Sequence, residues 1–186
     1  MIKEAIKKLV AGNDLTFDEA AQVMDEMFSG TATQSQMAAY LTALRIKGET
    51  IDEITASAQV MREKALHIKP NRDVLDIVGT GGDGTGTFNI STTAAFIIAA
   101  AGIPVAKHGN RSMSSKSGSA DCLEQLGINI NITPEKSEEV LNKAGICFMF
   151  AQGYHSSMKY VGPVRKEIGI RNIFNVLGPS GNGCVF

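Results

Sequence analysis

Residues 74–92 read Val-Leu-Asp-Ile-Val-Gly-Thr-Gly-Gly-Asp-Gly-Thr-Gly-Thr-Phe-Asn-Ile-Ser-Thr, an apolar run that leads through a glycine-rich segment into a polar, helix-like one. The apolar residues 74–78 are typical of a buried strand, and residues 91–101 predict a helix. Glycine permits positive φ and close approach of the backbone, so a row of amide N–H groups can face one anion, and the dipole of the following helix adds to the attraction. The segment therefore predicts a phosphate or diphosphate site.

Three other interpretations of the glycine-rich segment are weaker. Its spacing matches the dinucleotide-binding fingerprint, but that motif needs an acid about 20 residues further on, where this chain has Lys107 and His108. A Walker loop would need a lysine at Thr85. A tight turn without a ligand rarely needs so many glycines. Asn89 and Ser91 can cap the next helix as well as bind an anion, so both roles stay open.

A basic, serine-rich segment follows the second predicted strand, residues 103–106. Residues 107–121 read Lys-His-Gly-Asn-Arg-Ser-Met-Ser-Ser-Lys-Ser-Gly-Ser-Ala-Asp. Because ligands of open α/β sheets bind outside the carboxyl ends of the strands, this segment and the glycine-rich one are expected to face one crevice. Its three cations predict an anion clamp, although a solvated surface loop is the alternative.

The predicted fold class is α/β, with a small N-terminal helical domain and a parallel-sheet α/β domain. In residues 1–70, apolar residues recur three or four positions apart and predict four helices. Three of these helices begin with capping boxes: Thr16 with Glu19, Thr33 with Gln36, and Thr50 with Glu53. Glycine stands where three of them should end, at Gly12, Gly30 and Gly48.

Residues 71–154 form the predicted α/β domain, because short apolar runs alternate there with helical patterns. Further elements are a helix at 120–126, a weak strand at 128–132, a helix opened by Thr133 and a strand at 146–150. Residues 155–186 are expected to be a helical return segment, with helices at 155–167 and 171–176, followed by a divergent tail. The sheet should be parallel and buried on both faces.

Composition excludes several classes of protein. The chain has 186 residues, 44% hydrophobic content and a formal net charge of -1, so it is long enough for one or two domains and has no overall field that recruits nucleic acid or an anionic membrane. Its three cysteines form no C-x-x-C pair and indicate neither a disulfide framework nor a zinc site. No apolar run is made to cross a bilayer. We therefore expect a cytoplasmic protein whose partners are small molecules.

Four short motifs stand together in the α/β half of the chain. They read Gly79-Thr-Gly-Gly-Asp83, Asn89-Ile-Ser-Thr92, Lys107-His-Gly-Asn-Arg111 and Ser117-Gly-Ser-Ala-Asp121. In combination they closely resemble the anthranilate phosphoribosyltransferase family, and the resemblance runs from Met1 to about Pro179. It implies a fold like that of the class II phosphoribosyltransferases and nucleoside phosphorylases. The implied activity, in tryptophan biosynthesis, is transfer of the 5-phosphoribosyl group from phosphoribosyl diphosphate to the amine of anthranilate, with Mg²⁺ as cofactor.

The resemblance also implies roles for individual residues. The expected donor-binding residues are Gly79, Gly82, Asp83, Thr87, Asn89, Ile90, Ser91, Thr92, Lys107, Ser115 and Ser119. The expected anthranilate-binding residues are Gly79, His108, Asn110 and Arg165. Ser91 is also the expected magnesium ligand. No nucleophile or general base is expected, because an aryl amine is already neutral near pH 7 and the barrier lies in separating ribose from diphosphate.

Members of the family continue well past the position of Pro179, with further strands and an adjacent acidic pair that helps bind magnesium, whereas residues 180–186 do not resemble that continuation. An incomplete sheet should leave an edge and an apolar face uncovered. We therefore expect weak magnesium binding and association of the chain, with a homodimer formed through the helical domain. Two alternatives stay open: a pyrimidine nucleoside phosphorylase-like enzyme, and a non-catalytic fragment that keeps donor binding or dimerisation.

Overall fold

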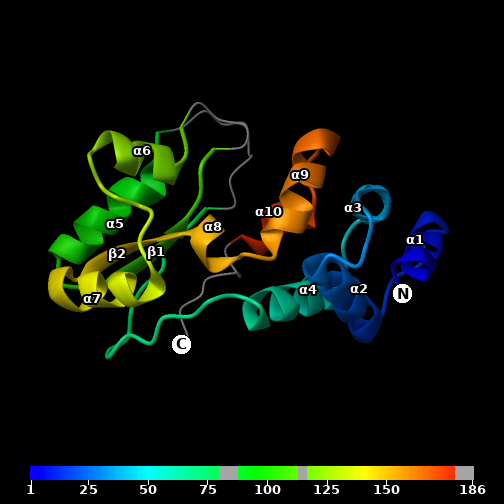
Figure 1. Cartoon of the computed structure of the whole chain (residues 1–186), viewed down its shortest axis with the longest axis horizontal. Coiled ribbons are helices and arrows are strands. Elements are labelled where there is room, and N and C mark those ends of the chain that lie inside the picture. Colours follow the sequence, from blue (N-terminus) through cyan, green and yellow to red (C-terminus); the bar gives the residue numbers. More distant parts are fainter. Residues whose placement is uncertain (80–87, 113–116, 179–186) are drawn as a thin grey trace. The chain divides into compact units, whose positions relative to one another are not determined.

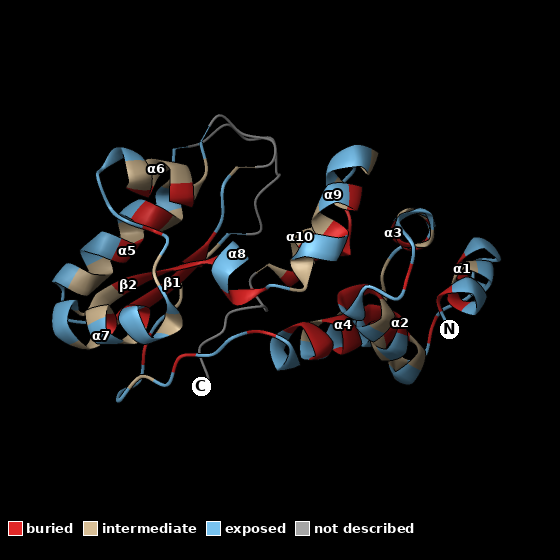
Figure 2. Ribbon diagram, viewed as in Figure 1, coloured by how far each residue is buried: buried red, intermediate tan, exposed pale blue. Residues whose placement is uncertain are grey.

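The computed structural model describes residues 1–79, 88–112 and 117–178, and the chain divides into two compact units (Figure 1). Unit 1 combines Met1–Lys64 with the helices that follow Ser156, and unit 2 is Ala65–His155. Each unit has its own buried side chains, drawn red in Figure 2. No helix among the described residues has the length and apolar character needed to span a bilayer.

Unit 1 is a helical bundle. Its helices are α1 (Ile2–Val10), α2 (Phe17–Ser29), α3 (Gln34–Lys47), α4 (Ile51–Glu63), α9 (Met158–Ile168) and α10 (Ile173–Leu177). The three predicted capping boxes are confirmed at the starts of α2, α3 and α4. The return helices α9 and α10 pack against α2, α3 and α4 and share one hydrophobic core with them. Residues 155–157, predicted to be helical, precede α9.

A buried carboxylate joins three segments of unit 1. Glu53 is fully buried and accepts hydrogen bonds from the Leu15 and Thr50 backbone amides, at 2.9 and 2.8 Å. It also accepts one from the Lys47 ammonium, at 3.0 Å. Because each oxygen of Glu53 has a partner, the charge is stabilised inside the bundle.

Unit 2 confirms the predicted parallel α/β arrangement. Its elements are α5 (Ile90–Ala100), β1 (Val105–Gly109), α6 (Ser119–Gln125), α7 (Pro134–Ala144), β2 (Ile146–Phe150) and α8 (Ala151–Tyr154). Strands β1 and β2 pair in parallel, from Val105 opposite Ile146 to Gly109 opposite Phe150. All five residues of β1 are buried. The strand begins two residues later than predicted and includes Lys107 and His108, so these two residues belong to the sheet rather than to the following loop.

The predicted strand at 74–78 is wrong as a full strand. Leu75 makes a single parallel bridge to Val105, with hydrogen bonds to Pro104 and Ala106. Beyond that bridge the Asp76 carboxylate, rather than a backbone carbonyl, accepts the hydrogen bond of the His108 amide, at 3.1 Å. A side-chain acceptor therefore replaces the next bond of the ladder.

The predicted strand at 128–132 is also wrong, because these residues form neither helix nor strand. The Asn129 side chain accepts a hydrogen bond from the Asn131 amide at 3.0 Å, a local contact that competes with strand pairing. Ile130 is nevertheless buried, in a small core with Leu123 and Phe148. The alternation of apolar residues thus indicated burial correctly, but not a strand.

Candidate functional site

Lys107 joins three segments at the carboxyl end of β1. Its ammonium donates to the Ile77 carbonyl at 2.7 Å and to the Ser91 hydroxyl at 3.2 Å. Ile77 lies two residues before Gly79, the first glycine of the glycine-rich segment, and Ser91 lies in the first turn of α5. The residue is 3% exposed, and burial lowers the pKa of the ammonium, although the Asp76 carboxylate opposes that shift. A partly desolvated cation thus lies beside the amino terminus of a helix, where an anion is doubly favoured.

His108, the next residue of β1, is also fixed by its neighbours. Its backbone amide donates to Asp76, and its ring contacts the ring of His155 edge-on, with centroids 5.3 Å apart. Both rings are 5% exposed. His108 was predicted to contact anthranilate; the structure places its side chain in a buried pair with His155.

One carboxylate, that of Asp121, holds the basic segment at Ser112 and at Gly118. Asp121 accepts hydrogen bonds from the Gly118 amide at 2.8 Å and from the Ser112 amide at 3.1 Å. These contacts, with Arg111 as a further partner, lower the pKa of the Asp121 carboxyl. A side chain at Gly118 would collide with the Asn110 and Arg111 backbone, at 2.7 Å. Glycine is therefore required where the segment closes on itself.

Arg111 does not present a free charge in this arrangement. Its guanidinium makes two hydrogen bonds to Glu124, at 2.5 and 2.8 Å, and a third to Asp121 at 3.1 Å. It also lies 5.6 Å from the centre of the Phe150 ring. The predicted anion clamp therefore loses one of its three cations to the acids of α6, while Lys116 lies outside the described residues.

The remaining predicted residues of unit 2 lie around the same end of the sheet. The Ser119 hydroxyl donates to the Asn110 carbonyl at 3.2 Å, and the Asn89 amide reaches the Ser117 hydroxyl at 3.5 Å. The start of α5 is thus next to the basic segment. Asn89 is the N-cap residue of α5, as one of its two interpretations had it, but its side chain makes no capping hydrogen bond. Gly79 is the last described residue before the glycine-rich segment; Gly82, Asp83, Thr87 and Ser115 lie outside the described residues.

Ile90 and Thr92 occupy the first turn of α5 on opposite sides. Ile90 is 53% exposed, whereas Thr92 is 3% exposed. The Thr92 hydroxyl has no hydrogen-bond partner in the described part of the chain. The Ile90 amide donates to the Phe88 carbonyl at 2.7 Å, so the amides that follow it in this turn, at Ser91 and Thr92, are the ones that can serve an anion.

Arg165, the predicted anthranilate ligand, belongs to α9 in unit 1. Its guanidinium lies 5.2 Å from the centre of the Phe174 ring, and burial lowers its pKa. Within residues 1–79, 88–112 and 117–178 it makes no ion pair, and its Nε atom has no hydrogen-bond partner. Unlike Arg111, it is a half-buried cation whose planar fork is available to a carboxylate.

Among the described residues, Ser91 is the predicted magnesium ligand. The described residues contain no group of three or more His, Cys, Asp or Glu side chains able to hold a metal ion. Ser91 offers one hydroxyl oxygen, which already accepts a bond from Lys107 and keeps a second lone pair. Mg²⁺ usually keeps several waters and shares substrate phosphates, so Ser91 fits as one ligand among diphosphate oxygens.

Comparison with known proteins identifies both parts of the chain. Residues 71–183 match the α/β-domain model of a glycosyl transferase family, and residues 3–65 match the helical-bundle-domain model of the same family. The chain belongs to this glycosyl transferase family. Its similar relatives include an anthranilate phosphoribosyltransferase of Endomicrobium trichonymphae, 63% identical over 98% of this chain and 54% of the relative. Another, from Ruminiclostridium cellulolyticum, is 60% identical over 98% of this chain and 53% of the relative.

Solved glycosyl transferase structures agree with the fold. Anthranilate phosphoribosyltransferase from Thermus thermophilus superposes with a TM-score of 0.90 at 46% identity, over 97% of this chain and 55% of that one. The Saccharomyces cerevisiae enzyme, solved in complex with PRPP and Mg, gives a TM-score of 0.89 at 28% identity, over 98% of this chain and 55% of that one. The chain spans about half the length of the relatives it matches.

Sequence reasoning missed two acids of the candidate site. Asp76 was read only as part of a strand, although a lone acid within an apolar run signals a specific partner. Asp121 was recognised within a motif but given no role. It stands at the third residue of a short helix, where a carboxylate reaches back to backbone amides. Both acids accept hydrogen bonds from backbone amides and so position the backbone of the site.

Proposed function

We propose that this chain carries the donor-binding region of an anthranilate phosphoribosyltransferase, which transfers the 5-phosphoribosyl group from phosphoribosyl diphosphate to the amine of anthranilate. The observation that carries the proposal is the contact of Lys107 with both Ser91 and Ile77. It joins a buried cation, the amino terminus of α5 and the start of the glycine-rich segment. Such a combination suits a diphosphate, and the relatives' names supply the donor and acceptor chemistry.

In the proposed reaction the bond between ribose C1 and the diphosphate oxygen breaks, and a bond from C1 to the anthranilate nitrogen forms. Diphosphate leaves with the electron pair, and the amine loses one proton to solvent. Because the nucleophile is already neutral, the chain has to hold the reactants in place and stabilise charge on the leaving group. The Lys107 ammonium and the first-turn amides of α5 serve the second task, and we nominate no general base.

Arg165 is the proposed partner of the anthranilate carboxylate. Its guanidinium is half buried and makes no ion pair with a described residue, so a bidentate carboxylate would compensate the cost of its desolvation. Asn110 and Gly79, both in unit 2, are proposed separately as contacts of anthranilate. His108 is proposed as a contact of the same site, although its buried pairing with His155 gives it a structural role in any case.

Mg²⁺ is proposed as the cofactor, held by Ser91 and diphosphate oxygens; when bound, it neutralises charge on the leaving group. We also propose a cytosolic setting and a homodimer formed through unit 1. Helix-borne side chains on that unit, Ile46 and Ile51, are each 81% exposed, which supports a further contact there. The relatives are named for anthranilate, so the nucleoside phosphorylase alternative has less support.

A second candidate, a non-catalytic fragment that keeps donor binding, is favoured by one observation: the chain spans about half the length of its relatives. Two assays separate the candidates. Calorimetric titration of phosphoribosyl diphosphate with Mg²⁺ into the chain measures donor binding, and loss of anthranilate fluorescence on mixing both substrates measures transfer. Donor binding with fluorescence loss supports the enzyme, and donor binding alone supports the fragment.

Variants of two lysines make the calorimetric assay specific. Lys107→Met keeps much of the side-chain volume but removes the charge, and should weaken donor binding by about thirtyfold, or about 2 kcal/mol. Lys143→Ala is the matched control, because Lys143 is 75% exposed on α7 and pairs only with Glu139 among the described residues. Absence of donor binding by the unmodified chain, or equal affinities for the two variants, would overturn the donor site.

A further inference from the structure

Helix α5 has an unusual surface for a helix at the edge of a folded unit. Its eleven residues, Ile-Ser-Thr-Thr-Ala-Ala-Phe-Ile-Ile-Ala-Ala, include no charged side chain. Only Thr92 and Ala95 are buried, while Phe96 is 40% and Ile97 65% exposed. A helix that is apolar on all sides is normally buried on all sides. The sequence of α5 therefore fits a helix with a covering layer on its outer face.

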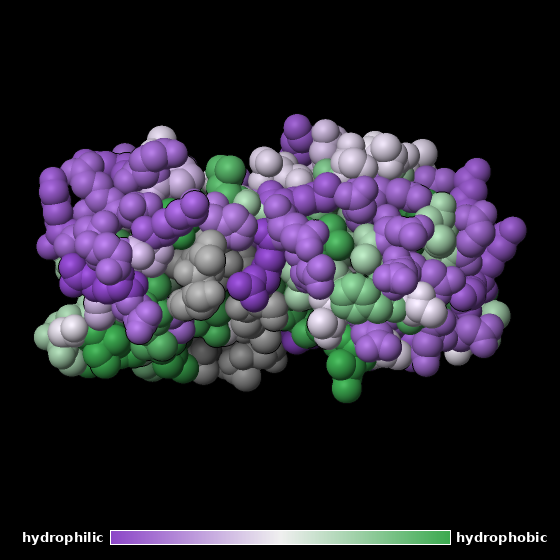
Figure 3. All heavy atoms as spheres, turned by 90° about the horizontal axis from the view of Figure 1, so that it is seen from below, coloured by the Kyte–Doolittle hydropathy of each residue, from purple (hydrophilic) through white to green (hydrophobic). Residues whose placement is uncertain are grey.

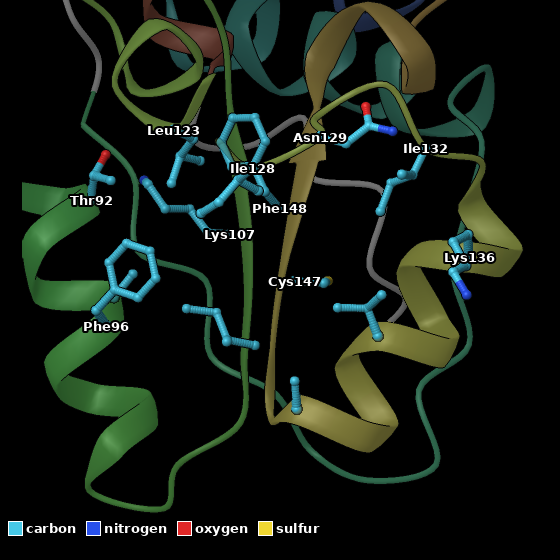
Figure 4. Close-up of a pocket in the computed structure, with 14 residues that line it drawn as sticks. Thr92, Phe96, Lys107, Leu123, Ile128, Asn129, Ile132, Lys136, Cys147 and Phe148 are labelled. Atoms are coloured by element: carbon cyan, nitrogen blue, oxygen red, sulfur yellow. The ribbon is translucent and has the colours of Figure 1, made fainter. Parts of the chain in front are cut away.

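An apolar cavity adjoins the same helix. It has a volume of about 460 Å³, and α5 and α7 flank it, with residues of β1 and β2 between them (Figure 4). Its apolar lining includes Phe96, Leu123, Ile128, Ile132, Val140 and Phe148. Nearby in the sequence, Ile103 and Leu126 are 51% and 65% exposed. In Figure 3, apolar surface, drawn green, gathers at the lower left, within unit 2.

The length of the relatives indicates what covers this face. The chain is 98% matched by the Endomicrobium trichonymphae relative but covers only 54% of it, so that relative has nearly as much chain again. A second copy fits less well. In a two-fold dimer the same patch of both copies is in contact. Two cavities that face each other would leave a void, and the residues that line it would lose dispersion contacts.

We propose that the outer face of α5 and the adjoining cavity form the docking surface for the part of the family fold that this chain does not match. The two pieces then assemble non-covalently when supplied as separate chains. This inference rests on family membership and on the uncovered apolar surface, and not on the proposed activity. The face is mostly apolar, with Lys107 and Lys136 also in the lining of the cavity, so docking should be driven mainly by burial and depend little on salt.

The test is co-expression of the 186-residue chain with the portion of the Endomicrobium trichonymphae relative that it does not cover. Affinity purification through a tag on that portion, followed by light scattering, should give a complex with equal numbers of both chains. Ile97→Asp places a charge on α5 and should weaken the complex at least about tenfold, with Ile97→Ala intermediate. Val10→Asp, at a 75% exposed position of unit 1, is the control and should leave it intact.

Each other outcome overturns the inference. No complex on co-expression, a complex unaffected by Ile97→Asp, or one lost equally in Val10→Asp would show that this face is not the docking surface. A dimer of the chain alone that only Ile97→Asp disrupts would show that a second copy covers it instead. Circular dichroism of the variants excludes unfolding as the cause, because both substituted side chains are exposed. Donor binding is measured separately, so failure of assembly is distinguishable from failure of the proposed function.

Discussion

The Lys107 ammonium lies 3.2 Å from the Ser91 hydroxyl and thereby connects the end of β1 to the first turn of α5. The same ammonium holds the Ile77 carbonyl at 2.7 Å, so one cation fixes the backbone at the entrance to the glycine-rich segment. Three parts of the candidate donor site are thus positioned before any ligand arrives, a form of preorganisation that limits the entropic cost of binding.

Donor affinity is expected to depend on pH through Lys107. Burial lowers the pKa of its ammonium below the ordinary 10.5, with Asp76 opposing the shift, and the neutral amine cannot attract diphosphate. Affinity should therefore fall as pH rises through this lowered pKa. Between the lowered pKa and 10.5 the unfolded chain binds more protons than the folded one, so the contribution of Lys107 to stability rises with pH. Unfolding therefore does not explain the loss of donor affinity. Calorimetry between neutral and alkaline pH should show a slope that Lys107→Met removes; the same slope in both proteins would contradict this.

Arg165→Ala should weaken anthranilate binding and leave donor binding nearly unchanged. A desolvated carboxylate partner predicts a loss of about 2 kcal/mol or more, which corresponds to about thirtyfold in affinity. Anthranilate binding is measured by calorimetry without the donor, so that no transfer takes place during the titration. Lys166→Ala, at the exposed neighbouring position of α9, is the control. Wild-type anthranilate affinity in the Arg165→Ala protein would refute the assignment.

Asp121→Ala should release the basic segment at Ser112 and at Gly118. Hydrogen exchange of the Gly118 and Ser112 amides should become about tenfold faster or more, because both lose a charged acceptor. Glu124→Ala removes the main partner of Arg111 but leaves these two bonds in place, and should not accelerate exchange. The lowered pKa of Asp121 means that its contribution is present above pH 3.8 and is lost as the pH falls through that lowered value. Unchanged exchange in Asp121→Ala would disprove this role.

Glu53→Ala should destabilise unit 1 strongly. It leaves the Leu15 amide without its acceptor and leaves Lys47, whose side chain is 6% exposed, without its buried partner. The free energy of unfolding should fall by about 3 kcal/mol or more. Glu19→Ala, which removes the exposed capping box of α2, should cost only about 1 kcal/mol. Denaturant titrations compare the two, and equal losses would count against a special role for Glu53.

The helices of unit 1 were predictable because their signals are local. A capping box is satisfied within one turn, so Thr16, Thr33 and Thr50 mark the starts of helices without reference to distant residues. Strand pairing depends on residues far apart in the sequence. The alternation at 128–132 could not show that Asn129 would bond to the Asn131 amide, nor could the run at 74–78 show that Asp76 would take the His108 amide.

The candidate site was predictable to the extent that strand order determines it. The rule that ligands lie at the carboxyl ends of strands correctly brought Lys107 near Ser91. Whether each arginine is paired with a carboxylate was not predictable, because nothing in the sequence distinguishes Arg111 from Arg165 in this respect. Only packing shows that Arg111 is engaged by Glu124, whereas Arg165 stacks on Phe174 with no carboxylate among the described residues.

The most direct test is a crystal structure of the chain with phosphoribosyl diphosphate and Mg²⁺ bound. The diphosphate oxygens are predicted to lie within hydrogen-bonding distance of the Lys107 ammonium and of the first-turn amides of α5 at Ser91 and Thr92. Diphosphate bound elsewhere, or an empty site at a donor concentration that saturates the calorimetric titration, would contradict the account.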